Sequence, residues 1–455
     1  MSVQSVIKHE SVVATGPFAP GHLGELTQIV PFEMVDAALE SARATQARLR
    51  ELPSRVVVYL LLSACLFPDI GYTRVWAKLT AGLTGAVAHP GSSALSQARL
   101  RIGAAPLREL FSLVKGPRPG AARWRGLLVC AIDGTSMFVP DTVANLGVYH
   151  RQTGGPRGDS GYPMVRMLAV VACGTRTIVD AVFGTYGVSE IAYAPKLFGC
   201  LRDGMLLLAD RNFAVASLVE QIVDVKADLL IRCKSNRKLP SIEQLPDGSW
   251  LAPIGTVVVR VIDAEIVITP KGSTPRTCRY RLITTLSDHR RYPASELVRL
   301  YHQRWEIETT YLELKSTILG DAMLRARTPA GVTQEVYALL TTYQALRIAI
   351  ADATTGTDIP PLRASFTVAL TTARDLVVLA SGVIAGTTVD LVGKIGRAVL
   401  ADLNPVRRAR DCPRVVKRAI SKHRAKGDVD RTNYPAVDIA IHVLKPSDWT
   451  DGRYP

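Results

Sequence analysis

Two short apolar runs, each closed by an aspartate, constrain the fold most strongly. The first run is residues 127–132, followed by Asp133, and the second is residues 205–209, followed by Asp210. Unbroken apolar runs of this length that end at a turn residue are typical of strands buried on both faces. Each run therefore predicts a central strand with an aspartate at its carboxyl end, where open α/β sheets place their chemistry. A single aspartate of this kind is more often a turn residue or a helix cap.

A charged stripe within residues 301–315 supplies a third acid. Four polar residues stand there at offsets of 0, 3, 7 and 14: Tyr301, Arg304, Glu308 and Lys315. At about 100° per residue on a helix, these offsets fall within an arc of roughly 60°. Cations beside a carboxylate suit a site where metal meets phosphate, but a surface helix laced with ion pairs has the same pattern. Glu306 and Glu313 fall on the other side, which we expect to face water.

Together, the two aspartates and Glu308 form an acidic triad able to hold hard cations through oxygen ligands. At these positions the chain resembles the DDE transposases of the insertion-sequence-4 family. The family motif Tyr-x2-Arg-x3-Glu-x6-Lys matches the four polar residues of the stripe, and the two family aspartates match Asp133 and Asp210. The resemblance covers most of the chain and is weakest towards the carboxyl end.

The resemblance implies a DNA transposase that cuts the ends of an insertion element and transfers the 3′ ends to target DNA. The implied catalytic residues, which are also the implied metal ligands, are Asp133, Asp210 and Glu308. Oxygen-only ligands favour two Mg²⁺ or Mn²⁺ ions over zinc. An element with inverted ends implies double-stranded DNA as the partner and a homodimer in the synaptic complex.

The remaining residues of the stripe are expected to contact DNA. In the family, the residues matching Tyr301, Arg304 and Lys315 position the transposon end. Trp305 could stack on an unpaired or flipped base, although a core tryptophan is an equally good interpretation.

Composition agrees with a nucleic-acid partner without proving one. The 55 Lys and Arg residues against 40 Asp and Glu give a net charge of +15, which favours a polyanion but is also compatible with simple solubility. The seven cysteines show no metal-ligand spacing, and they indicate buried thiols in a reducing compartment. The apolar stretch 56–67 is too short to cross a bilayer. We therefore expect a cytoplasmic, nucleoid-associated bacterial protein without membrane contact.

The order of the predicted elements permits a ribonuclease-H-like sheet, and the family resemblance implies an α/β protein with a ribonuclease-H-like catalytic core at residues 123–345. Alternating segments predict a β-rich insertion in this core at about residues 235–292. Residues 1–115 are expected to form a helical DNA-binding domain, or else a helical brace on the core. Residues 346–455 are expected to be helical and basic, with a cluster of arginines and lysines at 407–426 that suits phosphate contact.

Two other functions remain compatible with these residues. A nuclease or resolvase on the same fold would cut DNA without joining it. A non-catalytic DNA-binding derivative of a transposase would keep the fold, but it would have no need for three carboxylates in this arrangement.

Overall fold

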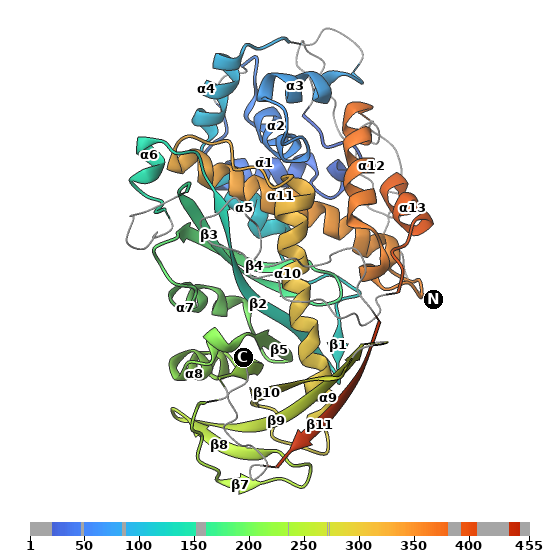
Figure 1. The fold of residues 1–455 in the computed structure, drawn as a ribbon. Helices are drawn as coiled ribbons and strands as arrows, with labels where there is room; N and C mark the ends of the chain where they lie inside the picture. The colour runs from blue at the N-terminus through green and yellow to red at the C-terminus, as the bar shows by residue number, and fades with distance from the viewer. Residues whose placement is uncertain are drawn as a thin grey trace.

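A single mixed sheet runs through the molecule (Figure 1). The computed structural model describes residues 21–46, 50–83, 88–151, 161–234, 236–270, 272, 274–380, 393–406 and 436–445. Within these ranges the strands are β1 (Arg123–Trp124), β2 (Leu127–Phe138), β3 (Met164–Ala172), β4 (Ile178–Thr185), β5 (Met205–Ala209), β6 (Asp228–Cys233), β7 (Glu243–Gln244), β8 (Trp250–Ile254), β9 (Val257–Pro270), β10 (Arg276–Thr284) and β11 (Val437–Leu444). Their order is β4-β3-β2-β5-β6-β10-β9-β8-β7, with β1 beside β2 and β11 beside β9.

Strand β2 is the centre of the sheet and is longer than the sequence predicts. It pairs parallel with β5 on one side and antiparallel with β3 on the other. We expected the strand to end at Asp133, and this is wrong. The antiparallel ladder with β3 continues to the pair Phe138–Met164, so Asp133 lies in the middle of β2. The chain passes through Asp133 and Gly134 without turning because β3 still supplies hydrogen-bond partners there.

Two helical layers cover the two faces of β2, and this explains its apolar run. Val129 and Ala131 pack into the larger core, which includes the amino-terminal helices and the long helix α11. Cys130 and Ile132 alternate with them and pack into a second core, under α7 and α8. A central strand buried on both faces needs apolar residues at every position. The predicted strands at β3, β4, β5 and β6 are all present.

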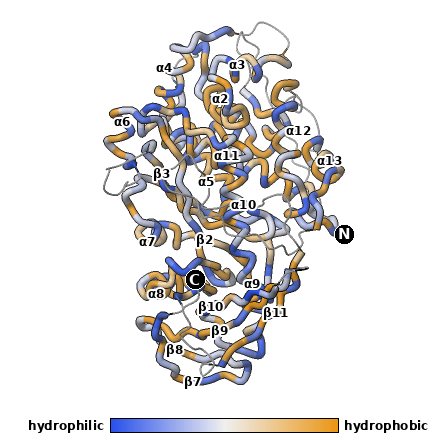
Figure 2. The backbone as a smooth tube through the Cα atoms, in the orientation of Figure 1, coloured by the Kyte–Doolittle hydropathy of each residue, from blue (hydrophilic) through white to orange (hydrophobic). Residues whose placement is uncertain are grey.

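The described helices, in chain order, pack around this sheet or at one end of the molecule. They are α1 (Phe32–Ser41), α2 (Ser54–Leu66), α3 (Tyr72–Thr80), α4 (Ser92–Ile102), α5 (Ala105–Val114), α6 (Val143–Leu146), α7 (Glu190–Tyr193), α8 (Ala216–Asp224), α9 (Ala294–Tyr301), α10 (Trp305–Leu312), α11 (Pro329–Thr354), α12 (Phe366–Val378) and α13 (Gly393–Ala401). The predicted apolar helix is α2, and its hydrophobic residues lie inside the helical end of the molecule (Figure 2). Among the described helices, none is long and apolar enough to span a membrane.

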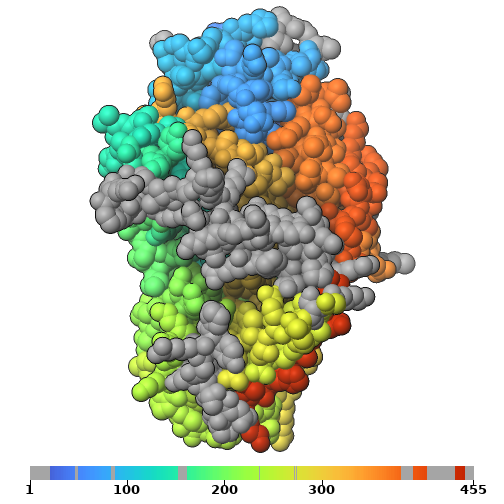
Figure 3. Space-filling model, in the orientation of Figure 1, coloured from blue at the N-terminus to red at the C-terminus, as the bar shows by residue number. Residues whose placement is uncertain are grey.

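Helix α11 joins the helical end of the molecule to the sheet. Its 26 residues are buried along most of their length, and it packs against α2, α5, α12 and α13. Thr328 accepts a hydrogen bond from the Gly331 N–H, and Pro329 follows at the first helical position, so the start of the helix is well defined. Helices α1–α5 form one end of the molecule, and strands β7–β9 form the other (Figures 1 and 3).

The strands of the predicted insertion extend the core sheet itself. Strand β10 pairs antiparallel with β6, and β9 follows β10 in the same sheet. On β9, residues 257–261 pair with β8, and residues 263–270 pair with β11. The expectation of a wholly helical carboxyl-terminal region is therefore wrong for Val437–Leu444, which complete the open edge of β9. The basic stretch 407–426 lies outside the described residues.

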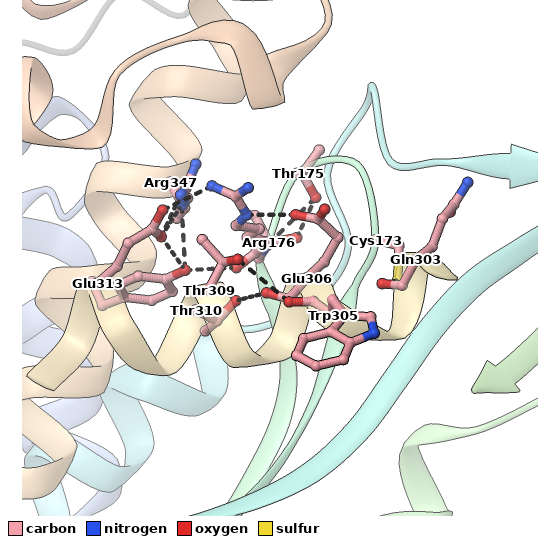
Figure 4. A network of polar contacts seen from close by, with 12 residues as sticks. Cys173, Thr175, Arg176, Gln303, Trp305, Glu306, Thr309, Thr310, Glu313 and Arg347 are labelled. Carbon is pink, nitrogen blue, oxygen red and sulfur yellow. Dashed lines mark hydrogen bonds and ion pairs between the residues drawn. The ribbon is translucent and has the colours of Figure 1, made fainter. Parts of the chain in front are cut away.

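The helical segment that carries the predicted stripe is held from behind by buried ion pairs (Figure 4). The expectation that Glu306 and Glu313 face water is wrong, since each residue is only 6% exposed. Arg176, in the turn between β3 and β4, donates from Nε to Glu306 at 2.7 Å and from a terminal nitrogen to Glu313 at 2.8 Å. Arg347 of α11 also donates from Nε to Glu313, at 3.1 Å. The Tyr343 hydroxyl, 3.0 Å from the same carboxylate, completes the network.

This network predicts that Glu313 contributes strongly to stability. The substitution Glu313→Gln removes the charge that Arg176 and Arg347 share, and an uncompensated buried charge costs about 3–5 kcal/mol. We expect urea unfolding of the full-length protein to shift to a much lower midpoint.

The matched control is Glu296→Gln, in the half-exposed pair between Glu296 and Arg125. Exposed pairs contribute about 0–1 kcal/mol, so this variant should unfold close to the unsubstituted protein. Equal losses in the two variants would contradict the importance of the buried network.

Candidate active site

The first two predicted acids are neighbours by sheet register. In the parallel ladder, Ala131 of β2 is opposite Leu208 of β5. Continuing that register by two residues places Asp210 beside Asp133, just beyond the point where β5 ends at Ala209. Asp210 also caps a short 3-10 turn, since its Oδ1 accepts the N–H of Asn212 at 2.8 Å. Capping uses one oxygen of this carboxylate and leaves the other without a hydrogen-bond partner among the described residues.

Asp133 sits in a buried, electrostatically crowded position. Burial raises the pKa of Asp133 to about 6, and the nearby negative charges of Asp210 and Glu190 contribute to the rise. The Gly134 N–H donates to Oδ1 at 2.8 Å, and this contact together with the charge of Arg304 opposes the shift. The desolvated carboxylate is therefore in an environment that favours a positive charge.

Arg304 bridges the first and third predicted acids. One of its terminal nitrogens donates to Asp133 Oδ2 at 3.1 Å, and the other donates to Glu308 Oε1 at 2.8 Å. The Arg304 side chain is 11% exposed, whereas that of Glu308 is 40% exposed. No three His, Cys, Asp or Glu side chains in the described ranges lie close enough to hold a metal ion as they stand. The guanidinium instead lies between the two carboxylates.

We expected one regular helix to carry the stripe, and this is wrong. Helix α9 passes into a 3-10 turn at His302–Arg304, then into α10, then into a π-helical segment at Glu313–Ile318. Because these segments wind differently, a constant 100° step does not describe the stripe. Lys315 nevertheless reaches β2, where its Nζ lies 3.4 Å from the Thr135 hydroxyl. Short π segments occur often at functional sites.

Tyr301 and Trp305 lie in contrasting environments. The Tyr301 side chain is buried, and its hydroxyl donates to the carbonyl of Ala209 at 3.0 Å. As placed, Tyr301 joins the stripe to the end of β5, directly before Asp210. Trp305 is 47% exposed, with the Arg304 guanidinium 5.2 Å from the centre of its ring. The interpretation of Trp305 as a core residue is therefore wrong for this arrangement.

Two residues that the sequence did not single out also border Asp133. The Tyr311 hydroxyl donates to the Asp133 carbonyl at 2.5 Å and accepts the N–H of Ala169 at 3.1 Å, so it fixes the backbone of β2. Glu190, the first residue of α7, lies against Gly134. Tyr311 lies within the motif segment, but the only sequence signal at Glu190 is an ordinary helix start after Ser189.

Comparison with known proteins identifies related transposases. A family model described as insertion element 4 transposase N-terminal matches residues 20–112, and a transposase DDE domain model matches residues 124–344. The transposase InsG for insertion sequence element IS4, from Escherichia coli K12, is 27% identical over 409 residues, covering 85% of this chain and 90% of that protein. The putative transposase InsZ of the same strain is 28% identical over 189 residues, and the match covers 40% of this chain and 62% of InsZ.

Among solved structures, the piggyBac transposase in a synaptic complex with hairpin DNA has a TM-score of 0.42 and 11% identity, with 88% of this chain and 87% of that chain covered.

The two family models follow one another along the sequence, and the relative InsG covers both. This chain belongs to the insertion-sequence-4 family of DDE transposases, and it is a DNA transposase that cleaves and joins DNA strands with divalent metal ions.

Proposed function

We propose that Asp133, Asp210 and Glu308 are the catalytic acids and hold two Mg²⁺ or Mn²⁺ ions. The observation that carries this proposal is the sharing of one guanidinium by Asp133 and Glu308, with Asp210 next to Asp133 by register. The donors are all carboxylate oxygens, which fit hard divalent cations. When bound, a pair of such ions would activate the attacking oxygen and stabilise the leaving oxygen at the ends of the insertion element and at the target DNA.

The topology supports a ribonuclease-H-like core for this chemistry. Strands β2, β3 and β4 are consecutive and antiparallel, whereas β5 and β6 add in parallel on the other side of β2. This is the sheet that the family resemblance implies. It supports the assignment because it sets Asp133 and Asp210 side by side on adjacent strands.

In this proposal Arg304 exchanges partners during the reaction. Its guanidinium neutralises Asp133 and Glu308 in the metal-free protein, and its Nε makes no hydrogen bond within the described residues. A DNA phosphate offers the same guanidinium a paired, charge-assisted contact. Release of Arg304 towards the backbone of the DNA then frees both carboxylates.

We assign Lys315 and Trp305 to DNA contact. Lys315 supplies a charge beside β2, and the exposed ring of Trp305 offers a surface for an unpaired base. Tyr301 is assigned to the DNA-end site through its position at the end of β5. Two inverted element ends call for two protomers, so we infer a homodimer in the complex with both ends.

Neutral substitution of the acids tests the proposal directly. Each of the variants Asp133→Asn, Asp210→Asn and Glu308→Gln should cut element ends at least about 100-fold more slowly, because metal stabilisation of the transition state is worth several kcal/mol. Cleavage and strand transfer of labelled end DNA in Mg²⁺ provide the measurement.

DNA binding by these variants should remain close to that of the unsubstituted protein. The matched control is Asp203→Asn, an exposed acid at the other end of β5, which should cut normally. Normal cutting by Asp210→Asn would refute the assignment of that residue.

The raised pKa of Asp133 predicts that this residue destabilises the metal-free protein. Its pKa is about 6 in the folded protein, against an ordinary value of 3.8, so ionisation costs folding stability as the pH rises from about 4 through 6. The cost reaches up to about 3 kcal/mol and persists at higher pH.

Asp133→Asn removes this cost, so in the presence of a chelator the variant should unfold at higher urea than the unsubstituted protein. The gain should be larger at pH 8 than at pH 5. A variant that is no more stable at pH 8 would contradict the inferred desolvation of Asp133.

The assignment of Lys315 predicts a specific change in salt dependence. Loss of one phosphate contact in Lys315→Gln should weaken binding to end DNA and reduce the slope of log affinity against log salt by about 1. Fluorescence anisotropy at several salt concentrations measures both quantities.

The control is Arg202→Gln, which removes the same charge at the opposite end of β5 from Asp210. If both variants change the slope equally, the effect belongs to net charge and not to a contact at Lys315.

A further inference from the structure

Gly134, directly after Asp133, makes room for a carboxylate from another element. A Cβ atom at this position would lie 2.2 Å from Oε1 of Glu190 and 2.5 Å from its carboxyl carbon. The backbone of Gly134 does not have a positive φ, so the residue is not needed for its conformational freedom. A glycine here is required by the close approach of Glu190 to the main chain of β2.

Glu190 approaches the strand from the face opposite the predicted stripe. Successive residues of a strand point to opposite faces. Asp133 faces the motif segment, where its Oδ2 accepts a hydrogen bond from Arg304, while a side chain at Gly134 would face Glu190 of α7. Burial raises the pKa of Glu190; the charge of Arg166 opposes this shift and the charge of Asp210 adds to it. The charge of Glu190 in turn adds to the raised pKa of Asp133, so the three carboxylates influence one another. Acids thus reach this part of β2 from both faces.

The Glu190 carboxylate forms no direct ion pair with a described arginine, lysine or histidine. It is half-buried, and no hydrogen bond or ion pair reaches it from the described residues. The positive charge of Arg166 partly offsets the rise in the pKa of Glu190 that burial causes, but the Arg166 guanidinium donates to the Val188 carbonyl at 2.5 Å and stacks on Tyr186 at 4.2 Å from the ring centre. A half-buried charge without a partner is costly, and this cost indicates a role that needs the charge.

The simplest alternative is an acidic residue that stabilises the start of a helix. An acid in the first turn can interact favourably with the free N–H groups of a helix. That role works equally well with the side chain in solvent, and it gives no reason for the space at Gly134. Helix α7 is also only four residues long, so little of a helix dipole is available.

We propose that Glu190 is a fourth acid of the active site, which helps Asp133 and Asp210 to hold a divalent cation across Gly134. The inference rests on the proposed function of those two aspartates. The chemistry is that of the two aspartates, since another carboxylate adds oxygen ligands for a hard cation. Among the described residues, no direct ion pair competes for this carboxylate. Glycine at 134 is then a requirement of the metal site.

Glu190→Gln tests this inference, because the amide has the same shape and lacks the charge. The loss of an acid beside the metal should raise the Mn²⁺ concentration for half-saturation of the full-length, DNA-free protein about 10–100-fold. Electron paramagnetic resonance of free Mn²⁺ measures this binding without any reaction. The Mg²⁺ concentration for half-maximal cleavage should rise by a similar factor, and excess Mg²⁺ should restore much of the rate.

Two further variants separate a metal role from a structural one. Glu190→Asp keeps the charge and should retain more Mn²⁺ affinity than Glu190→Gln, whereas a purely structural role would make the shorter side chain the worse substitute. Gly134→Ala should weaken Mn²⁺ binding by displacing Glu190. If Gly134→Ala does not fold, the comparison of the two Glu190 variants decides alone. Glu243→Gln, an exposed acid of β7, should leave metal binding unchanged.

Unchanged Mn²⁺ affinity and unchanged Mg²⁺ dependence in Glu190→Gln would overturn the inference. Asp133→Asn, assayed in parallel, distinguishes this failure from failure of the proposed function. If Asp133→Asn loses Mn²⁺ binding and cleavage while Glu190→Gln keeps both, only the role of Glu190 is refuted. If Asp133→Asn also keeps both, the site itself has been assigned wrongly.

Discussion

The buried ion pairs of Arg176 and Arg347 fix the segment that carries Glu308, the proposed third acid. Glu308 comes from a segment that winds as 3-10, α and π helix in turn, and such a segment has no single regular geometry of its own. Glu306 and Glu313 attach its back to the β3–β4 turn and to α11. With the back fixed, Arg304, Glu308 and Lys315 are left to face β2. Because the ion-paired charges on the back are buried away from water, their geometry has a large effect on stability.

Some parts of the site could be predicted from the sequence, and others depend on partners that are distant in the chain. The apolar runs before Asp133 and Asp210 identified two central strands, because a strand buried on both faces has few alternatives to continuous apolar residues. The spacing of the stripe singled out Glu308, and its catalytic role stays a prediction. Sequence could not show that β2 continues past Asp133, since that depends on hydrogen bonds from β3, which is distant in the chain. The failure at Glu306 and Glu313 has a similar cause, because their arginine partners lie on other elements.

Two further features were missed for identifiable reasons. Val437–Leu444 alternates apolar and polar residues, as a strand with one covered face does, but the neighbouring basic stretch dominated the interpretation of this region. Its partner is the second half of β9, which β8 leaves unpaired. Glu190 gave no distinct signal, because a glutamate after a serine is an ordinary helix start. Its meaning comes only from the space at Gly134, which is visible once β2 and α7 are together.

The site combines stabilising and destabilising charges in adjacent positions. On the back of the motif segment, each buried carboxylate has an arginine partner, and the pairs stabilise the fold. On the front, Asp133 and Glu308 share a single guanidinium. The front is therefore short of positive charge, and bound divalent cations would remove the deficit. A protein that filled the front with its own cations would be more stable without metal, but it would compete with the ions on which its chemistry depends.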